Sequence, residues 1–186
     1  MGKIEGIRIE NYGTLKYVCM GRLFSYQKGD PLGNMVTIIG PSGTGKSTIA
    51  DAFGFLADCL EKGVEEACDM GNRGGFKQLI SQGNEKVIRF ELYYRETSNS
   101  KPITYELAIG LDKTERPYVL EERLRQRVEK RGWPKSFLNL HEGIGYAFEG
   151  TDGWQDDEGN ITGRGRRVEV CLADKRKLGI ATYGAM

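Results

Sequence analysis

The chain has 186 residues, of which 39% are hydrophobic and 28% are charged, and its formal net charge is +1. These values are ordinary for one soluble globular domain, and the near-neutral charge excludes a global electrostatic argument for nucleic acid or membrane. No stretch reaches the ~18 apolar residues of a membrane span, and the amino-terminus lacks the apolar run of a signal peptide. We therefore expect a cytoplasmic protein without a membrane partner.

The first third of the chain predicts strands, a loop and a helix. A first strand is marked by three isoleucines, Ile4, Ile7 and Ile9. A turn at 11–13 leads to a second strand at 15–23, and the polar stretch 27–34 predicts a loop. Residues 35–39, MVTII, form a continuous run with several β-branched side chains, which predicts a buried strand.

After Lys46 the apolar residues change to helical spacing. Five of them share one helix face: Ile49, Phe53, Leu56, Ala57 and Leu60. They predict a helix that ends near Gly63, a residue suited to the position after a helix. A second helical piece is predicted from 64 to 70, and a turn, short helix and turn from 73 to 84.

Alternating apolar and polar residues then predict an antiparallel meander with one wet face. Its three segments are 88–94, 103–111 and 118–124, joined by the turn-like stretches TSNSKP and DKTERP. Beyond Lys130, closely spaced glycines predict short, irregular pieces. We therefore divide a single domain into three parts: opening strands and first helix at 1–70, meander at 71–130, and an irregular glycine-rich part at 131–186.

The cysteines do not predict a metal site or a disulfide framework. None of the four forms a Cys-x-x-Cys pair, and the single histidine, His141, has no cysteine near it in the sequence. Reduced, structural thiols are the expectation for Cys19, Cys59, Cys68 and Cys171.

Residues 40–48, GPSGTGKST, fit the phosphate-binding pattern G-x-x-x-x-G-K-[ST] at every fixed position. A triphosphate needs many donors at close range, and backbone N–H groups supply them where glycines keep side chains away. Lys46 would bridge the terminal phosphates as the catalytic cation, and Ser47 would offer its hydroxyl to Mg²⁺. The predicted ATP and Mg²⁺ site comprises Gly40, Pro41, Ser42, Gly43, Thr44, Gly45, Lys46, Ser47 and Thr48.

Hydrolysis also needs an acid at the end of a buried strand, to hold Mg²⁺, and a group that orients water. Two apolar runs end in an aspartate, at Asp112 and Asp174, but each aspartate is followed by a lysine. A turn residue and a solvated residue are the alternative interpretations, and neither acid makes a convincing magnesium ligand. The sequence reads like the first part of an ATPase.

The order of these motifs resembles the amino-terminal part of ABC-type ATPases, in the branch of the SMC and RecF proteins. The stretches that carry the similarity lie within residues 4–111: IRIENYGTL, VTIIGPSGTGKSTIADAFGFL, GGFKQLISQG, FELYYRE and ITYELAIGL. RecF-like bacterial AAA family ATPases, found with nucleases in DNA repair and antiphage systems, are the most similar group. The resemblance implies an α/β P-loop NTPase fold, namely the amino-terminal lobe of an ATPase head with an antiparallel β meander.

The resemblance also implies site residues and partners. Asn11 and Tyr12 would lie near the base or sugar, although Tyr12 could instead pack on the sheet edge. The expected partner is a second ATPase head or a carboxy-terminal lobe, with a nuclease or DNA as further candidates. The LSGGQ-type signature of the family does not occur in this sequence. Hydrolysis is therefore expected to depend on elements that this chain lacks, and Gln82 and Gln155 match the family's glutamine loop only by residue type.

Two other functions remain open. Small nucleoside-monophosphate kinases carry similar loops, but they place the loop after the first strand and follow it with helices and an arginine-rich lid. A non-hydrolysing module would bind ATP only to set its shape. Separately, the basic stretch 121–135, with Trp133, could contact DNA phosphates or form a salt-bridged, solvated face.

Overall fold

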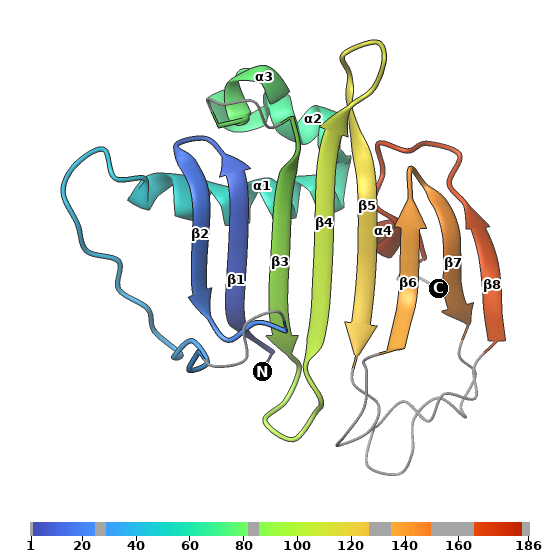
Figure 1. Ribbon diagram of the computed structural model, residues 1–186, viewed down its shortest axis with the longest axis horizontal. Coiled ribbons are helices and arrows are strands. Elements are labelled where there is room, and N and C mark those ends of the chain that lie inside the picture. The colour runs from blue at the N-terminus through green and yellow to red at the C-terminus, as the bar shows by residue number, and fades with distance from the viewer. Residues whose placement is uncertain (1, 25–28, 82–85, 127–134, 150–165, 184–186) are drawn as a thin grey trace.

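One antiparallel sheet of eight strands dominates the described part of the chain, in the order β2-β1-β3-β4-β5-β6-β7-β8 (Figure 1). The structure is a computed structural model that describes residues 2–24, 29–81, 86–126, 135–149 and 166–183. The strands are β1 (Lys3–Tyr12), β2 (Leu15–Gly21), β3 (Ile88–Arg95), β4 (Ile103–Leu111), β5 (Pro117–Gln126), β6 (Lys135–His141), β7 (Ile144–Glu149) and β8 (Arg166–Cys171).

The helices of the described residues lie on one face of this sheet (Figure 1). They are α1 (Lys46–Lys62), α2 (Val64–Asp69), the 3-10 turn η1 (Met70–Asn72), α3 (Phe76–Leu79) and α4 (Gly179–Tyr183). The main core forms where α1 crosses the sheet. Its buried residues include Ile49, Ala52, Phe55 and Cys59 from α1 and Ile7, Ile9, Phe90, Leu107 and Ile109 from the strands.

Much of the predicted order is confirmed. The hairpin β1–β2, the helix α1 and the meander β3–β5 all form where the sequence patterns place them. Gly63 follows α1 with a φ of 99°, a left-handed conformation that favours glycine. The three predicted parts belong to one sheet, because β1 pairs with both β2 and β3, and β6 pairs with β5.

The prediction of a buried strand at 35–39 is wrong in this structure. These residues form no ladder and lie in a long segment outside β2 (Figure 1). Met35 is 87% exposed and Ile39 is 89% exposed. A continuous apolar run suits a strand that is covered on both faces, and such cover needs neighbours. The described sheet supplies none, because each of its ladders joins two of the eight named strands and none of them includes 35–39.

We expect Ile39→Gln to change the free energy of unfolding of this chain by less than ~0.5 kcal/mol, as for most exposed positions. The same change at buried Ile109, which is 0% exposed, serves as the positive control. Urea denaturation measures both. A loss at Ile39 comparable to that at Ile109 would show that 35–39 is buried after all.

The carboxy-terminal part is more regular than its glycines indicate. The described residues from 135 onward form β6, β7, β8 and α4, which continue the sheet rather than end it. Two of these glycines fit the sheet: Gly143 has a φ of 78° in the β6–β7 turn, and Gly145 lies so close to Asn139 that a side chain would clash. Here glycine serves a tight turn and a close backbone approach.

Candidate nucleotide-binding site

The phosphate-binding loop is an exposed turn that leads directly into α1. Gly43 and Gly45 have φ values of 80° and 86°, a region that favours glycine. A Cβ on Gly45 would lie 2.6 Å from Leu15 Cδ2, so packing against β2 also requires glycine there. A Cβ on Gly43 would meet nothing within 4 Å, which leaves open space above this part of the loop.

Lys46, the first residue of α1, folds back over the loop. Its Nζ donates to the carbonyl of Pro41 and lies 3.5 Å from Thr44 Oγ1. The Thr44 hydroxyl also donates to the Pro41 carbonyl, at 2.9 Å. The ammonium is thus held at the mouth of the turn, where phosphate oxygens could replace the Pro41 carbonyl as its acceptors.

The amino-terminal end of α1 is open to an anion. Gly45 provides no side-chain cap, and no acidic residue lies in the first turn of this 17-residue helix. The free amides and the positive end of the helix dipole therefore remain uncompensated by the protein. Together with the bare glycine backbone, this arrangement suits a phosphate group.

The turn between β1 and β2 packs against the start of α1. Thr14 Oγ1 lies 3.2 Å from Thr48 Oγ1, and a Cβ on Gly13 would lie 2.7 Å from Thr48 Cγ2. The same turn holds the segment after α3, because the Ser81 amide donates to the Asn11 carbonyl at 3.0 Å. The structure thus brings residues 11–14 beside the phosphate-binding loop.

Asn11 and Tyr12 make structural contacts at this turn. Asn11 has a φ of 59° and donates from Nδ2 to the carbonyl of Val87. Tyr12 is 0% exposed, and its ring packs against Phe55 and Phe90, with centroids 5.3 and 5.7 Å away. The structure therefore favours the packing interpretation of Tyr12, because a nucleotide base could not reach its ring without opening the core.

A partly buried ion-pair network, which the sequence did not reveal, fixes α1 against β1. The Tyr12 hydroxyl donates to Asp51 at 2.5 Å, and Arg73 donates to Asp51 and Asp58. Burial, followed by the hydrogen bond to Asp51, raises the pKa of Tyr12 far above its usual value. Asp51 and Asp58 lie two helical turns apart on one face of α1. Their spacing places both carboxylates on one helix face, but it does not identify Arg73 as their shared partner.

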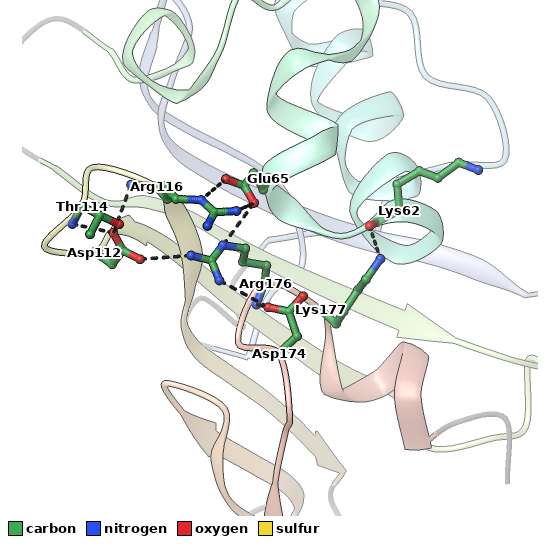
Figure 2. A network of polar contacts seen from close by, with 8 residues as sticks. All are labelled: Lys62, Glu65, Asp112, Thr114, Arg116, Asp174, Arg176 and Lys177. Carbon is green, nitrogen blue, oxygen red and sulfur yellow. Dashed lines mark hydrogen bonds and ion pairs between the residues drawn. The ribbon is translucent and has the colours of Figure 1, made fainter.

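The two candidate magnesium acids lie elsewhere. Asp112 and Asp174 both contact Arg176, which also pairs with Glu65 at the start of α2 (Figure 2). This network holds the carboxy-terminal end of α1, where Lys177 donates to the carbonyl of Lys62. The phosphate-binding loop lies at the other end of α1, about 25 Å away for 17 residues at 1.5 Å each. Both acids are therefore turn residues rather than ligands of a metal at Ser47.

Asp112 provides a test of this network through pH. Its pKa falls from 3.8 to about 2, chiefly because the Thr114 hydroxyl donates to it, and the Arg116 amide adds a second bond (Figure 2). A depressed pKa in the folded state stabilises the fold above the unfolded pKa, and this contribution is lost as pH falls toward about 2. We expect Asp112→Asn to lower Tm at pH 5 and to converge with the native chain near about pH 2.

Thermal denaturation across this pH range measures the effect. Asp30→Asn, at an exposed aspartate, is the matched control and should parallel the native curve. A constant difference between Asp112→Asn and the native chain at every pH would contradict the assigned role of the carboxylate.

The structure describes part of the basic stretch 121–135, namely residues 121–126 and 135. Arg125 and Arg123 both contact Glu106 across the sheet, which agrees with the salt-bridged alternative for these two residues. Residues 127–134, which include Trp133, lie outside the described residues, as do Gln82 and Gln155. Among the described residues, no cluster of three or more histidine, cysteine or acidic side chains could hold a metal ion, and the four cysteines are free.

In the ranges that the structure describes, no helix has the length and apolar character needed to cross a membrane.

A family model described as "AAA domain, putative AbiEii toxin, Type IV TA system" matches residues 35–152, more than half of the chain. The matched region contains the phosphate-binding loop, α1, the whole meander β3–β5, and β6 and β7. No curated protein and no solved structure matches the chain.

Proposed function

Because the chain belongs to the AAA-domain family that bears the AbiEii toxin description, we propose that it binds Mg²⁺-ATP through residues 40–48. The observation that carries this proposal is the exposed glycine turn at the uncapped, positive end of α1. Gly43, Gly45, Lys46 and Ser47 would contribute backbone amides, Lys46 would contact the terminal phosphates, and the Ser47 hydroxyl would bind Mg²⁺. Bound Mg²⁺ would offset the charge of the phosphates.

The more specific proposal is a nucleotide-binding lobe of an SMC/RecF-like ABC ATPase in a DNA repair or antiphage defence system. Three features in chain order support it: a hairpin before the loop, a helix after it, and an antiparallel meander. The family description points to a toxin–antitoxin or defence setting. The kinase alternative is less well supported, since a β meander and not a helical lid follows α1.

We propose that residues 35–39 form a strand that pairs with strands from a carboxy-terminal lobe or a second ATPase head. In an extended segment, Met35 and Ile39 point to one side and Val36 and Ile38 to the other. All four side chains are at least 40% exposed. Apolar residues on both sides suit a central strand of a parallel sheet covered by helices. Strand pairing by residues 35–39 would also hold the backbone that leads into the phosphate-binding loop.

If ATP hydrolysis needs a partner, the isolated chain should bind ATP without hydrolysing it efficiently, and this can be measured. Incubation of the purified chain with Mg²⁺-ATP, with and without nucleoside monophosphates, distinguishes the three candidate functions. We expect ATP binding with little phosphate release, because the two candidate magnesium acids, Asp112 and Asp174, lie at the other end of α1 from Ser47. Rapid phosphate release by this chain alone would contradict the need for a partner. Phosphate transfer to a monophosphate would establish the kinase.

A further inference from the structure

The face of the sheet opposite the helices carries charged side chains in adjacent rows. Register places Arg89 beside Glu10 and Ala108, and Ala108 beside Glu121. In the next row, Arg8 pairs with Glu91, while Glu106 pairs with Arg123. Their chain neighbours Ile9, Phe90 and Leu107 point the other way, into the core under α1. These charged rows therefore lie apart from the phosphate-binding loop.

Ala108 creates a hollow in this face. Its methyl group stands among long side chains and leaves a space of about 110 Å³. The charged and polar groups around it are Arg8, Arg89, Arg123, Glu106, Glu121 and Asn139. A space of this size holds a single small ion with a few waters, rather than a nucleotide.

The arginines around the hollow have unused hydrogen-bond donors. Arg89 reaches Glu121 only at 3.6 Å, and Arg123 Nη1 reaches Glu106 only at 3.8 Å; both distances exceed a hydrogen bond. Arg8 Nε is buried and makes no hydrogen bond in the part of the chain that is described, although Glu10 lies 3.3 Å away. A guanidinium has five N–H donors, so each of these groups has capacity for a further acceptor.

We propose that this hollow binds a small tetrahedral oxyanion of the phosphate class. Guanidinium groups from three strands lie around the hollow. Each guanidinium can donate two parallel hydrogen bonds to two oxygens of one phosphate. Four acids lie along these rows, and they do not close the site. Two of them pair with Arg8: Glu91 lies 3.0 Å from its Nη2 and Glu10 lies 3.3 Å from its Nε. Glu106 is engaged by Arg125, and the Glu121 side chain is 50% exposed and can turn toward solvent. Glu121 thus competes with the anion for Arg89.

The test uses the Lys46→Ala chain, in which the phosphate-binding loop is weakened, and low salt, because exposed charges are screened. Inorganic phosphate is titrated while backbone amide shifts are followed by NMR. We expect shifts at Arg89, Ala108 and Arg123. In this background Arg89→Gln should weaken binding roughly tenfold, the effect of one charge-assisted bond. Glu121→Gln should tighten it ~2- to 5-fold, the value of an exposed ion pair.

The opposite signs of these two substitutions distinguish a binding site from a structural ion pair, whose two halves would act alike. Lys113→Gln, which removes a positive charge from the β4–β5 turn, is the control and should leave binding unchanged. Weaker binding in Glu121→Gln, or no shift at Ala108 at tens of millimolar phosphate, would overturn the proposal. Failure here leaves ATP binding by the native chain untouched, and failure of ATP binding leaves this hollow untouched.

A second probe identifies the source of the oxyanion. Glycerol phosphate presents the same group at the end of a larger molecule. Equal binding of glycerol phosphate and inorganic phosphate supports a site for terminal phosphate groups. Binding of inorganic phosphate alone supports a site for the free ion.

Discussion

Mg²⁺-ATP should bind roughly ten- to a hundredfold more weakly to the Lys46→Ala chain than to the native chain. The substitution removes one charge-assisted hydrogen bond to phosphate, worth ~1.5–3 kcal/mol, and each ~1.4 kcal/mol is a factor of ten. Lys46 already donates to the Pro41 carbonyl. Part of the gain on binding is therefore an exchange of acceptors, which favours the lower end of this range. Isothermal titration calorimetry measures the change.

Lys62→Ala is the matched control for this experiment. Lys62 lies at the other end of α1, its side chain is 41% exposed, and it pairs with Glu61. The control removes the same charge from the same helix but leaves the loop intact, so ATP affinity should be unchanged. Equal affinities for Lys46→Ala and the native chain would rule out the loop as the main phosphate contact.

Glu122→Ala should lower the free energy of unfolding by about 2–4 kcal/mol, since its carboxylate accepts bonds from donors that would be left unpaired. Glu122 is 0% exposed on the helix side of the sheet. It accepts the amides of Gly179 and Ile180, at 2.5 and 3.0 Å, and the hydroxyl of Tyr105 at 3.1 Å. The first two bonds hold the start of α4 against β5, and urea denaturation reports their loss.

The effect of Glu122→Ala should also vary with pH. Burial raises the pKa of Glu122, although the bonds from Ile180 and Gly179 act against this rise. An acid with a raised folded pKa stabilises most below its unfolded pKa, and this contribution declines as pH rises through the folded value. The difference between the native chain and Glu122→Ala should therefore be larger near about pH 4.5 than at pH 7.

Glu121→Ala controls for the loss of a carboxylate on the same strand. The Glu121 side chain is 50% exposed, so its loss should cost less than ~0.5 kcal/mol. A Glu122→Ala chain as stable as Glu121→Ala would show that the carboxylate does not anchor α4.

Sequence patterns predicted the elements that depend on local periodicity. The change from a glycine-rich turn to helical spacing at Lys46 marked α1, and strict alternation marked β3 and β4. Residues 35–39 were predicted wrongly, because burial of an apolar strand depends on neighbours that only the fold can supply. The apolar run 35–39 favours a strand, but no described strand pairs with it in the structure.

The polar contacts between distant elements were beyond prediction for a similar reason. Arg73 meets Asp51 and Asp58 only because the chain folds back over α1. Glu122 did carry a local signal, since it shares the parity of Leu124 on the apolar side of β5. Its partners, the amides of α4, lie 57 and 58 residues away along the chain. Register within one strand cannot indicate a partner at that distance.

The turn before α1 is proposed to bind the phosphates of a nucleotide. Titration of Mg²⁺-ATP into the isotope-labelled native chain, followed by backbone NMR, tests it residue by residue. We expect the largest shifts at the amides of Gly43, Gly45, Lys46 and Ser47. Saturating nucleotide that leaves these four amides unshifted, whatever moves elsewhere, would contradict it.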